Sequence, residues 1–366
     1  MMLKRSGFRD FDIMLIGLAL LIFTIGILTI HSATMAKGLS FSEGFVFRQL
    51  NWLIIGVILL FIAILLSYQR FIDLAYLIYA INIALLALVL FLGHVRLGAQ
   101  RWFSIAGFAF QPSELTKLGL VLVLANYVGS RKGAMSDIRS LIVPCILLAV
   151  PFLLVLLQPD LGTALLLIPV FFSILIIGGA ELKYLGGMAL IGLAGLPFFW
   201  HFLRDYQKQR LLVFINPNVD PLGAGYTIIQ SKIAVGSGGL FGKGWLAGTQ
   251  NQLNFLPERH TDFIFSVIGE EWGLVGALAV VFLYFMIVRK AFTIASLTSD
   301  LYGRAIAVGI GTLIAFQAII NISMTIGLMP VVGIPLPLVS YGGSSLIATL
   351  IAIGLLINVG LRRSTF

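Results

Sequence analysis

The chain has 366 residues, of which 59% are hydrophobic and 11% are charged, and its formal net charge is +9. Its mean hydropathy is +1.05. A soluble domain of this length needs far more polar surface, so the composition excludes that class and predicts a protein that crosses a membrane several times.

Ten apolar stretches are long enough to cross a bilayer, which takes roughly 20 residues in a helix. They fall at about 12–31, 50–67, 71–92, 113–129, 141–157, 161–178, 184–203, 263–288, 304–328 and 342–361. A basic segment precedes the first stretch without a convincing cleavage site, so we expect an uncleaved first helix. The predicted fold is an all-α polytopic membrane protein with ten transmembrane helices, and residues 1–366 form one membrane domain.

Lysine and arginine in short loops predict the orientation of these helices. With the N-terminus in the cytoplasm, the cytoplasmic side holds Lys4, Arg5, Arg9, Arg70, Arg131, Lys132, Arg139, Lys183, Arg289, Lys290, Arg304, Arg362 and Arg363. The short outer loops hold only Lys37, Arg48, Arg96 and Arg101. Both termini are therefore predicted to be cytoplasmic. This bias explains much of the net charge without a nucleic-acid partner, which would need a soluble basic patch.

The outer side then receives one long loop, at about 204–262, between the seventh and eighth helices. Apolar residues run through it, as in "YTIIQSKIAV", so we expect it to pack against the membrane surface or to re-enter it. A second outer segment, 329–341, has three prolines, which forbid a regular helix. Irregular backbone at membrane depth needs protein or water to satisfy it, so this segment is expected to be buried against protein.

The glycine-rich stretch "GSGGLFGKG" does not fit a phosphate-binding loop of the nucleotide-binding kind. Ser237 stands at the position of the first required glycine, and Gly244 stands where serine or threonine is needed. The stretch leaves backbone N–H groups beside Lys243 that either cradle an anion or belong to tight turns. The four histidines are scattered and Cys145 is the single cysteine, so no metal site is predicted.

Several ionisable residues stand at the outer ends of the predicted helices. "QPSELTK" opens the fourth helix, and its Glu114 and Lys117 share one helix face, as a structural ion pair or as the lining of a polar cavity. "QPDLG" places Asp160 at an outer turn, where it either caps the turn or lines the cavity. Arg101, beside Trp102, is either an interfacial anchor or a ligand for a lipid phosphate.

The stretch "LPERHTDFIF" precedes the eighth apolar run. Pro257 fits the first position of a helix that would run to about residue 288, with Glu258 in its first turn. Asp262 would share the face of Glu258 but lie deeper. Partial desolvation would raise the pKa of Asp262, whereas the helix start and Arg259 would lower it. The carboxylate is either a proton acceptor or the partner of Arg259 in a salt bridge.

The outer side thus collects acids and bases around an apolar body. The acids are Asp160, Glu258 and Asp262, and the bases are Arg101, Lys117, Arg210, Lys232 and Lys243. Anionic head groups on long lipid tails fit such a place. An acid that accepts a proton, beside cations that stabilise a leaving phosphate, suits transfer chemistry on a lipid-phosphate donor.

Four blocks of the sequence resemble the SEDS family (shape, elongation, division and sporulation). Residues 220–276 resemble its signature region, and "GAQRWFSIAGFAFQPSELTK", "QPDLGTALLL" and "PVVGIPLPLVSYGGSSL" resemble its other blocks in the same order. The resemblance covers nearly the whole chain. The form "FLPERHTDFIF" and the short tails are similar to the elongation branch of the family rather than to the division branch.

This resemblance implies a peptidoglycan glycosyltransferase that polymerises lipid II, the undecaprenyl-pyrophosphate-linked disaccharide-pentapeptide, during cell elongation. It implies work on the outer face of the bacterial cytoplasmic membrane, with a class B penicillin-binding protein that crosslinks the glycan and with other membrane proteins of the elongation complex. The alternatives are a flippase that moves lipid II across the bilayer and a non-catalytic scaffold.

The resemblance also implies roles for individual residues. Asp262, in "TDF", matches the family's catalytic aspartate and would act as the general base in an inverting transfer that makes β-1,4 links and releases undecaprenyl pyrophosphate. The expected substrate-binding residues are Arg101, Glu114, Lys117, Asp160, Arg210, Lys232, Lys243 and Glu258. A divalent cation, Mg²⁺ or Mn²⁺, bridging the pyrophosphate is compatible with this chemistry, although the sequence shows no dedicated cage for one.

Overall fold

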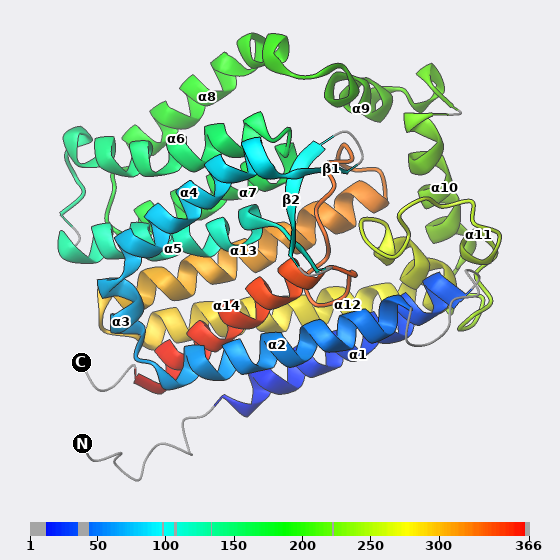
Figure 1. Cartoon of the computed structure of the whole chain (residues 1–366), viewed down its shortest axis with the longest axis horizontal. Helices are drawn as coiled ribbons and strands as arrows, with labels where there is room; N and C mark the ends of the chain where they lie inside the picture. Colours follow the sequence, from blue (N-terminus) through cyan, green and yellow to red (C-terminus); the bar gives the residue numbers. More distant parts are fainter. Residues whose placement is uncertain are drawn as a thin grey trace.

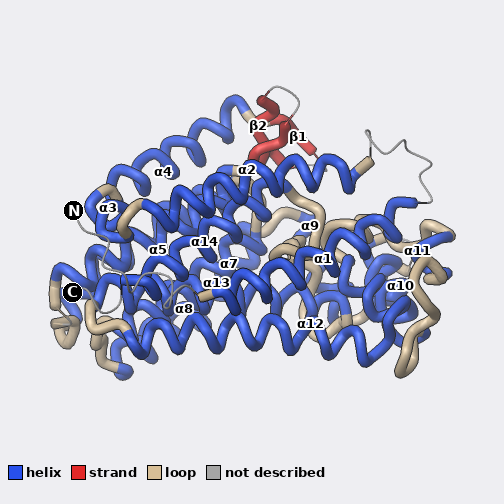
Figure 2. Tube along the Cα trace, turned by 90° about the horizontal axis from the view of Figure 1, so that it is seen from below, coloured by secondary structure: helices blue, strands red, loops and turns tan. Residues whose placement is uncertain are grey.

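The computed structural model describes residues 12–35, 44–96, 99–105, 108–132, 134–221 and 223–362. Lys4, Arg5, Arg9, Lys37 and Arg363, on which part of the predicted orientation rests, lie outside the described residues. Long helices run side by side through most of the molecule (Figures 1 and 2).

Eight helices in the described ranges are long and apolar enough to cross a membrane. They are α1 (Ile13–Met35), α2 (Phe45–Leu65), α4 (Ala75–Leu92), α6 (Ile142–Leu157), α8 (Leu182–Phe202), α12 (Ile264–Leu297), α13 (Leu301–Thr325) and α14 (Gly343–Arg362). The prediction of an all-α polytopic membrane protein is confirmed. The predicted count of ten also needs α5 (Pro112–Ser130) and the shorter apolar helix α7 (Leu161–Ile177), and it stays a prediction.

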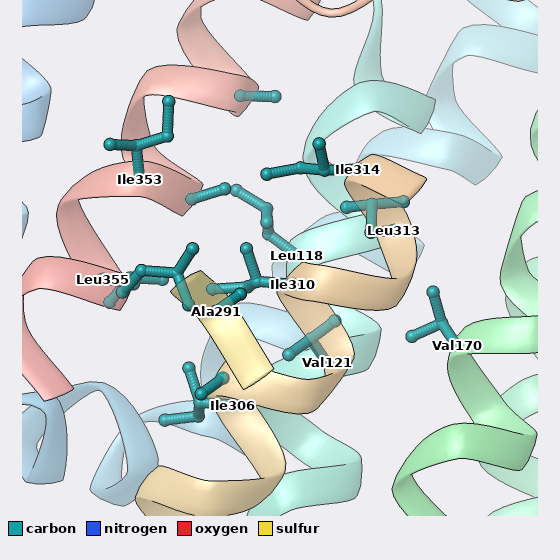
Figure 3. Close-up of a cluster of buried hydrophobic side chains, with 14 of the residues drawn as sticks. Leu118, Val121, Val170, Ala291, Ile306, Ile310, Leu313, Ile314, Ile353 and Leu355 are labelled. Carbon is teal, nitrogen blue, oxygen red and sulfur yellow. The ribbon is translucent and has the colours of Figure 1, made fainter. Parts of the chain in front are cut away.

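The bundle is built around α5 and α13, which are buried along most of their length. Figure 3 shows the centre of the core, where side chains from α5, α7, α12, α13 and α14 meet. Small residues let these helices approach closely: a Cβ at Gly309 of α13 would stand 2.9 Å from atoms of both Val121 and Ile174. Such close packing holds helices together in lipid, where the hydrophobic effect gives no net drive between them.

The described chain also contains a small sheet that the sequence did not predict. Its strands are β1 (His94–Arg96), β2 (Ala99–Ile105) and β3 (Phe108–Phe110), which pair antiparallel in the order β1-β2-β3. In the second pairing, Phe103 lies opposite Phe110. The strands connect α4 to α5 and lie toward the same end of the bundle as the long loop (Figures 1 and 2).

The segment between α8 and α12 is folded into short helices. They are α9 (Asp205–Ile215), η2 (Pro217–Val219), α10 (Ala224–Ser237) and α11 (Thr249–Gln252). On α10, the fully buried Ser231 shares a 2.6 Å hydrogen bond with Ser266 of α12, so the loop packs against the bundle. The expected packing of the loop against the membrane surface, or its re-entry, stays a prediction. The end of α14 lies toward the opposite end, beside α3 (Tyr68–Asp73), and the start of α1 is directed toward that end (Figure 1).

The predicted start of α12 was wrong. The helix begins at Ile264 rather than at Pro257, and it continues to Leu297 instead of ending near residue 288. Residues 257–263 form turns, because Glu258 has a left-handed φ of +49° and its carbonyl accepts from the amide of Phe263. A helix cannot continue through that backbone conformation. Glu258 and Asp262 therefore do not share a helix face.

A break interrupts α12 at Gly273, whose φ is +66°. The glycine-rich stretch supplies hydrogen-bond partners at this break. The amides of Lys243 and Gly244 donate to the carbonyls of Glu270 and Glu271, at 3.0 Å each. In return, the amide of Leu274 donates to the carbonyl of Gly239 over 2.9 Å. The stretch therefore forms tight turns packed on α12, which is the second of the two interpretations of its glycines.

The segment between α13 and α14 is irregular and buried against protein, as its prolines predicted. The side chains of Leu336, Leu338 and Val339 are each at most 3% exposed. The amide side chain of Gln317 on α13 donates to the carbonyl of Pro335 over 3.2 Å. Protein groups thus satisfy backbone that lies deep in the bundle, which membranes require of non-helical segments.

Candidate active site

Asp262 lies in the turns just before α12 and lines a cavity of about 200 Å³. Its side chain is partly accessible through that cavity. The other lining residues come from α9, α10, the turns before α12 and the segment after α13: Arg210, Thr227, Ile228, Pro257, Glu258, Phe263 and Val331. Two carboxylates, of Asp262 and Glu258, and one guanidinium, of Arg210, thus line a space with otherwise largely apolar walls.

Gly333 lies close to the side chains of both Asp262 and Arg210. A Cβ built at Gly333 would stand 3.4 Å from Asp262 Oδ2 and 3.9 Å from Arg210 Nη1. Arg210 Nη1 donates to the carbonyl of Val331 over 3.3 Å, and its guanidinium carbon lies 5.6 Å from the centre of the Tyr206 ring. The base candidate and a cation candidate therefore meet at the edge of the same cavity.

Burial among these neighbours raises the pKa of Asp262 to about 6. The Arg210 guanidinium opposes the shift, because it stabilises the ionised form, and the Glu258 carboxylate adds to it. A carboxylate with this pKa is mostly ionised at neutral pH and is more basic than an exposed aspartate, which are the properties of an effective general base.

Arg101 lies in a smaller cavity that adjoins the first. This cavity of about 20 Å³ is lined by Arg101, Tyr206, Arg210 and Val331, among others, and so shares Arg210 and Val331 with the cavity at Asp262. Arg101 Nε donates to the carbonyl of Gln158 over 2.9 Å. Arg210 therefore lines both cavities, and Arg101 lines the one next to the cavity of Asp262.

Asp160 caps the start of α7. Its Oδ1 accepts from the amide of Thr163 over 3.2 Å and lies 3.7 Å from Nη1 of Arg101. Its Oδ2 accepts from Nε2 of Gln111 over 3.1 Å. Asp160 is buried and does not line either cavity, so the structure favours the capping interpretation. It is linked to the site by its ion pair with Arg101.

Glu114 and Lys117 form an ion pair of 2.8 Å inside the bundle. Their side chains are 4% and 2% exposed, and neither lines the two cavities described above. A charge pair at such a position is held together because separating it would leave an uncompensated charge in the apolar interior. The structure therefore favours the structural interpretation of this pair.

The remaining predicted residues differ in whether they line the cavity at Asp262. Glu258 is exposed and lines the cavity, where it accepts from Oγ1 of Thr261 over 3.1 Å. Lys232 is exposed on α10 and packs against Gly327, and it does not line the cavity. Lys243 does not line the cavity either. Its Nζ lies 2.8 Å from Oε1 of Glu270, with which it forms an ion pair.

Arg259 does not pair with Asp262. Its buried side chain donates instead to the carbonyl of Ala33 over 2.6 Å and to the side chain of Asn254. The alternative interpretation of Asp262, as the partner of Arg259 in a salt bridge, was therefore wrong.

Comparison with known proteins identifies the family. The family model described as "Cell cycle protein" (FTSW_RODA_SPOVE) matches residues 12–365. The chain belongs to this family, the SEDS family.

Curated SEDS relatives match along almost their whole length. "Peptidoglycan glycosyltransferase MrdB" of Escherichia coli (strain K12) is 39% identical over 355 residues, which cover 97% of this chain and 94% of the relative. "Peptidoglycan glycosyltransferase RodA" of Treponema pallidum is 34% identical and covers 99% and 100% of the two chains.

Solved structures share the SEDS fold. A chain from "Structural coordination of polymerization and crosslinking by a peptidoglycan synthase complex" is 36% identical with a TM-score of 0.83, over 97% of this chain and 99% of that one. The rod shape determining protein RodA of Thermus thermophilus is 33% identical with a TM-score of 0.73, over 97% and 98%.

Sequence reasoning missed two buried acids of this SEDS chain, Glu270 and Glu271. Glu270 accepts from the amides of Gln250 and Asn251, at 3.0 and 3.3 Å, and Glu271 accepts from the side chain of Ser32. Both hold the long loop on α12. The signal was available, because "GEEW" places two adjacent acids inside an apolar run, where ionisable groups are costly.

Among the residues that the structure describes, no group of three or more histidine, cysteine, aspartate or glutamate side chains is arranged to hold a metal ion. The charged groups around the two cavities are Arg101 from β2, Arg210 from α9, and Glu258 and Asp262 from the turns before α12.

Proposed function

We propose that this chain is a peptidoglycan glycosyltransferase that polymerises lipid II into β-1,4-linked glycan strands. The observation that carries the proposal is the position of Asp262, a carboxylate with a pKa of about 6, in a cavity that it shares with Arg210. The names of the SEDS relatives agree with this reaction class.

Asp262 acts as the general base in this proposal. The 4-hydroxyl oxygen of the acceptor sugar attacks C1 of the donor sugar while its proton passes to the Asp262 carboxylate. The bond between C1 and the phosphate oxygen breaks, and its electron pair leaves with undecaprenyl pyrophosphate, so C1 inverts. Asp262 then returns its proton to water. General base action of this kind contributes about 10²–10⁴ in rate.

Arg210 and Arg101 stabilise the charge on the leaving pyrophosphate. Both line the small cavity beside Asp262, and Arg101 is already held by the carbonyl of Gln158. A guanidinium fixed in this way stabilises developing negative charge without reorganising during the reaction, which is a large term in catalysis. Glu114, Lys117 and Asp160 support the site from inside the bundle rather than by contact with substrate.

The proposed setting is the bacterial cytoplasmic membrane. Asp262 and the long loop lie on its outer face and both termini lie in the cytoplasm, as the distribution of lysine and arginine predicts. The proposed partner is a class B penicillin-binding protein that crosslinks the product, together with other membrane proteins of the elongation complex. A related chain forms part of a peptidoglycan synthase complex, which supports this proposal.

Polymerisation by the purified chain in detergent tests this function. Lipid II is the only substrate supplied, and glycan chains are separated by gel electrophoresis. The wild type should make polymer, and Asp262→Asn, which keeps the size of the side chain but removes its basicity, should lower the rate at least about 100-fold. Detergent has no two sides, so a flippase would make no polymer. Normal synthesis by Asp262→Asn would refute the base role.

A further inference from the structure

The backbone that carries Asp262 is docked on the irregular segment between α13 and α14. The carbonyl of His260 accepts from the amide of Tyr341 over 2.9 Å. The carbonyl of Thr261 accepts from Oγ of Ser340 over 2.6 Å. Two successive carbonyls before the proposed base are therefore fixed by neighbouring residues of another element.

Asn321 holds the third carbonyl in this series. It is fully buried on α13, and its Nδ2 donates to the carbonyl of Asp262 over 3.0 Å and to the carbonyl of Ile334 over 2.7 Å. Ile334 directly follows Gly333, the residue that faces Asp262 Oδ2. One amide group therefore ties the backbone of Asp262 to the segment that carries Gly333.

The side-chain oxygen of Asn321, Oδ1, is buried and has no hydrogen-bond partner among the described residues. A buried polar atom without a partner is costly, and a helix in a membrane core packs well with apolar side chains. The amide at this position is thus better explained by the geometry of its two donors than by stability alone.

We propose that Asn321 is a positioning residue for Asp262. This inference rests on the proposed function. By tying the Asp262 carbonyl to that of Ile334, Asn321 holds the Asp262 carboxylate in the position from which it accepts the proton. A base must lie about 2.6–3.2 Å from the oxygen it deprotonates, and a misplacement of about 1 Å can cost about 100-fold in rate.

Gln317 supplies a matched control on the same helix. It stands four residues before Asn321, is also buried, and its Nε2 donates to the carbonyl of Pro335. It therefore reaches the same segment as Asn321, one residue further along, but its side-chain amide bonds Pro335 and not Asp262. Removing its amide loosens that segment and leaves the hydrogen bond to the Asp262 carbonyl in place.

The test measures kcat and KM for lipid II with the full-length chain in detergent. Asn321→Leu, which removes both donors at similar volume, should lower kcat about 10- to 100-fold with KM changed less than about threefold. Gln317→Met should leave kcat within about threefold. Asn321→Ser, whose hydroxyl cannot bridge both carbonyls, should lower kcat in the same way and provides the test if Asn321→Leu does not fold. Thermal unfolding of each variant shows which of them fold.

A double variant separates positioning from general damage. In the Asp262→Asn background, Asn321→Leu should not lower the residual rate further, because a positioning residue acts only through the base. An additional loss, an unchanged kcat with raised KM, or an equal kcat loss in Gln317→Met would each overturn the proposal. The wild type and Asp262→Asn are assayed first, so failure of the proposed function itself is recognised separately, by the absence of wild-type polymer.

Discussion

Lys117 Nζ lies 2.8 Å from Glu114 Oε2, and both side chains are almost fully buried in α5. Removing one partner of such a pair leaves a buried charge without compensation. We therefore predict that Lys117→Met lowers the free energy of unfolding by about 3–5 kcal/mol, measured by denaturation of the purified protein in detergent.

The matched control for this pair is the double variant Glu114→Gln with Lys117→Met, which carries no buried charge. It should recover much of the stability lost in Lys117→Met. A Lys117→Met protein that keeps its stability but loses polymerisation would instead favour a place for this pair in the substrate cavity.

The pH dependence of polymerisation should report the ionisation of Asp262. Because burial raises its pKa to about 6, and because the base acts when ionised, kcat/KM should fall as the pH drops below about 6 and level off above it. The measurement is a pH series of initial rates with wild-type protein. A profile that stays flat down to pH 4 would contradict the prediction.

Glu258→Gln refines the pH experiment. The Glu258 carboxylate raises the pKa of Asp262, since two negative charges repel each other. Removing that charge should move the acidic limb of the profile to lower pH. Asp220→Asn is a suitable control, because Asp220 is a loop carboxylate that does not contribute to the shift of Asp262. An unchanged limb in Glu258→Gln would show that Glu258 does not act on the base.

Gly333 should tolerate no side chain without loss of activity. Its φ of +73° disfavours any L-residue, by roughly 1–2 kcal/mol, and an added methyl group would stand 3.4 Å from Asp262 Oδ2. Gly333→Ala should therefore lower both stability and the rate of polymerisation.

Gly239→Ala controls for backbone strain in that experiment. Gly239 also has a left-handed φ, +57°, but a Cβ there would meet nothing within 4 Å. It should lose a similar amount of stability and keep its activity. Equal loss of activity in the two variants would mean that strain alone, rather than the contact of the new methyl group with Asp262, explains the effect at Gly333.

The membrane helices could be predicted from the sequence because their length and apolar character are local properties. The predicted stretch 304–328 and the observed Leu301–Thr325 differ by only three residues at each end. The start of α12 could not be predicted, since nothing in "LPERHTDF" announces the left-handed φ of Glu258. The short strands around Trp102 gave too weak a pattern to be noticed.

The candidate site was predicted in part. Asp262 was singled out as an acid at a helix mouth, and the family resemblance implied its role. Its neighbours depend on tertiary structure: Arg210 and Asp262 come together beside Gly333, which lies far from both in the sequence. Asn321 lies inside an apolar helix, and its function as a bridge is visible only once Ile334 is seen to lie beside it.

The break in α12 attaches the long loop to the helix by backbone hydrogen bonds, which an ordinary connection between helices lacks. At Gly273 the helix and the glycine-rich stretch share one ladder of hydrogen bonds, in which the amides of Lys243 and Leu274 each reach across to the other element. Peeling the loop away would break these hydrogen bonds and leave the non-helical turn at Gly273 without its backbone partners. The loop is thus part of the wall of the membrane body, and a flexible linker of equal length could not take its place.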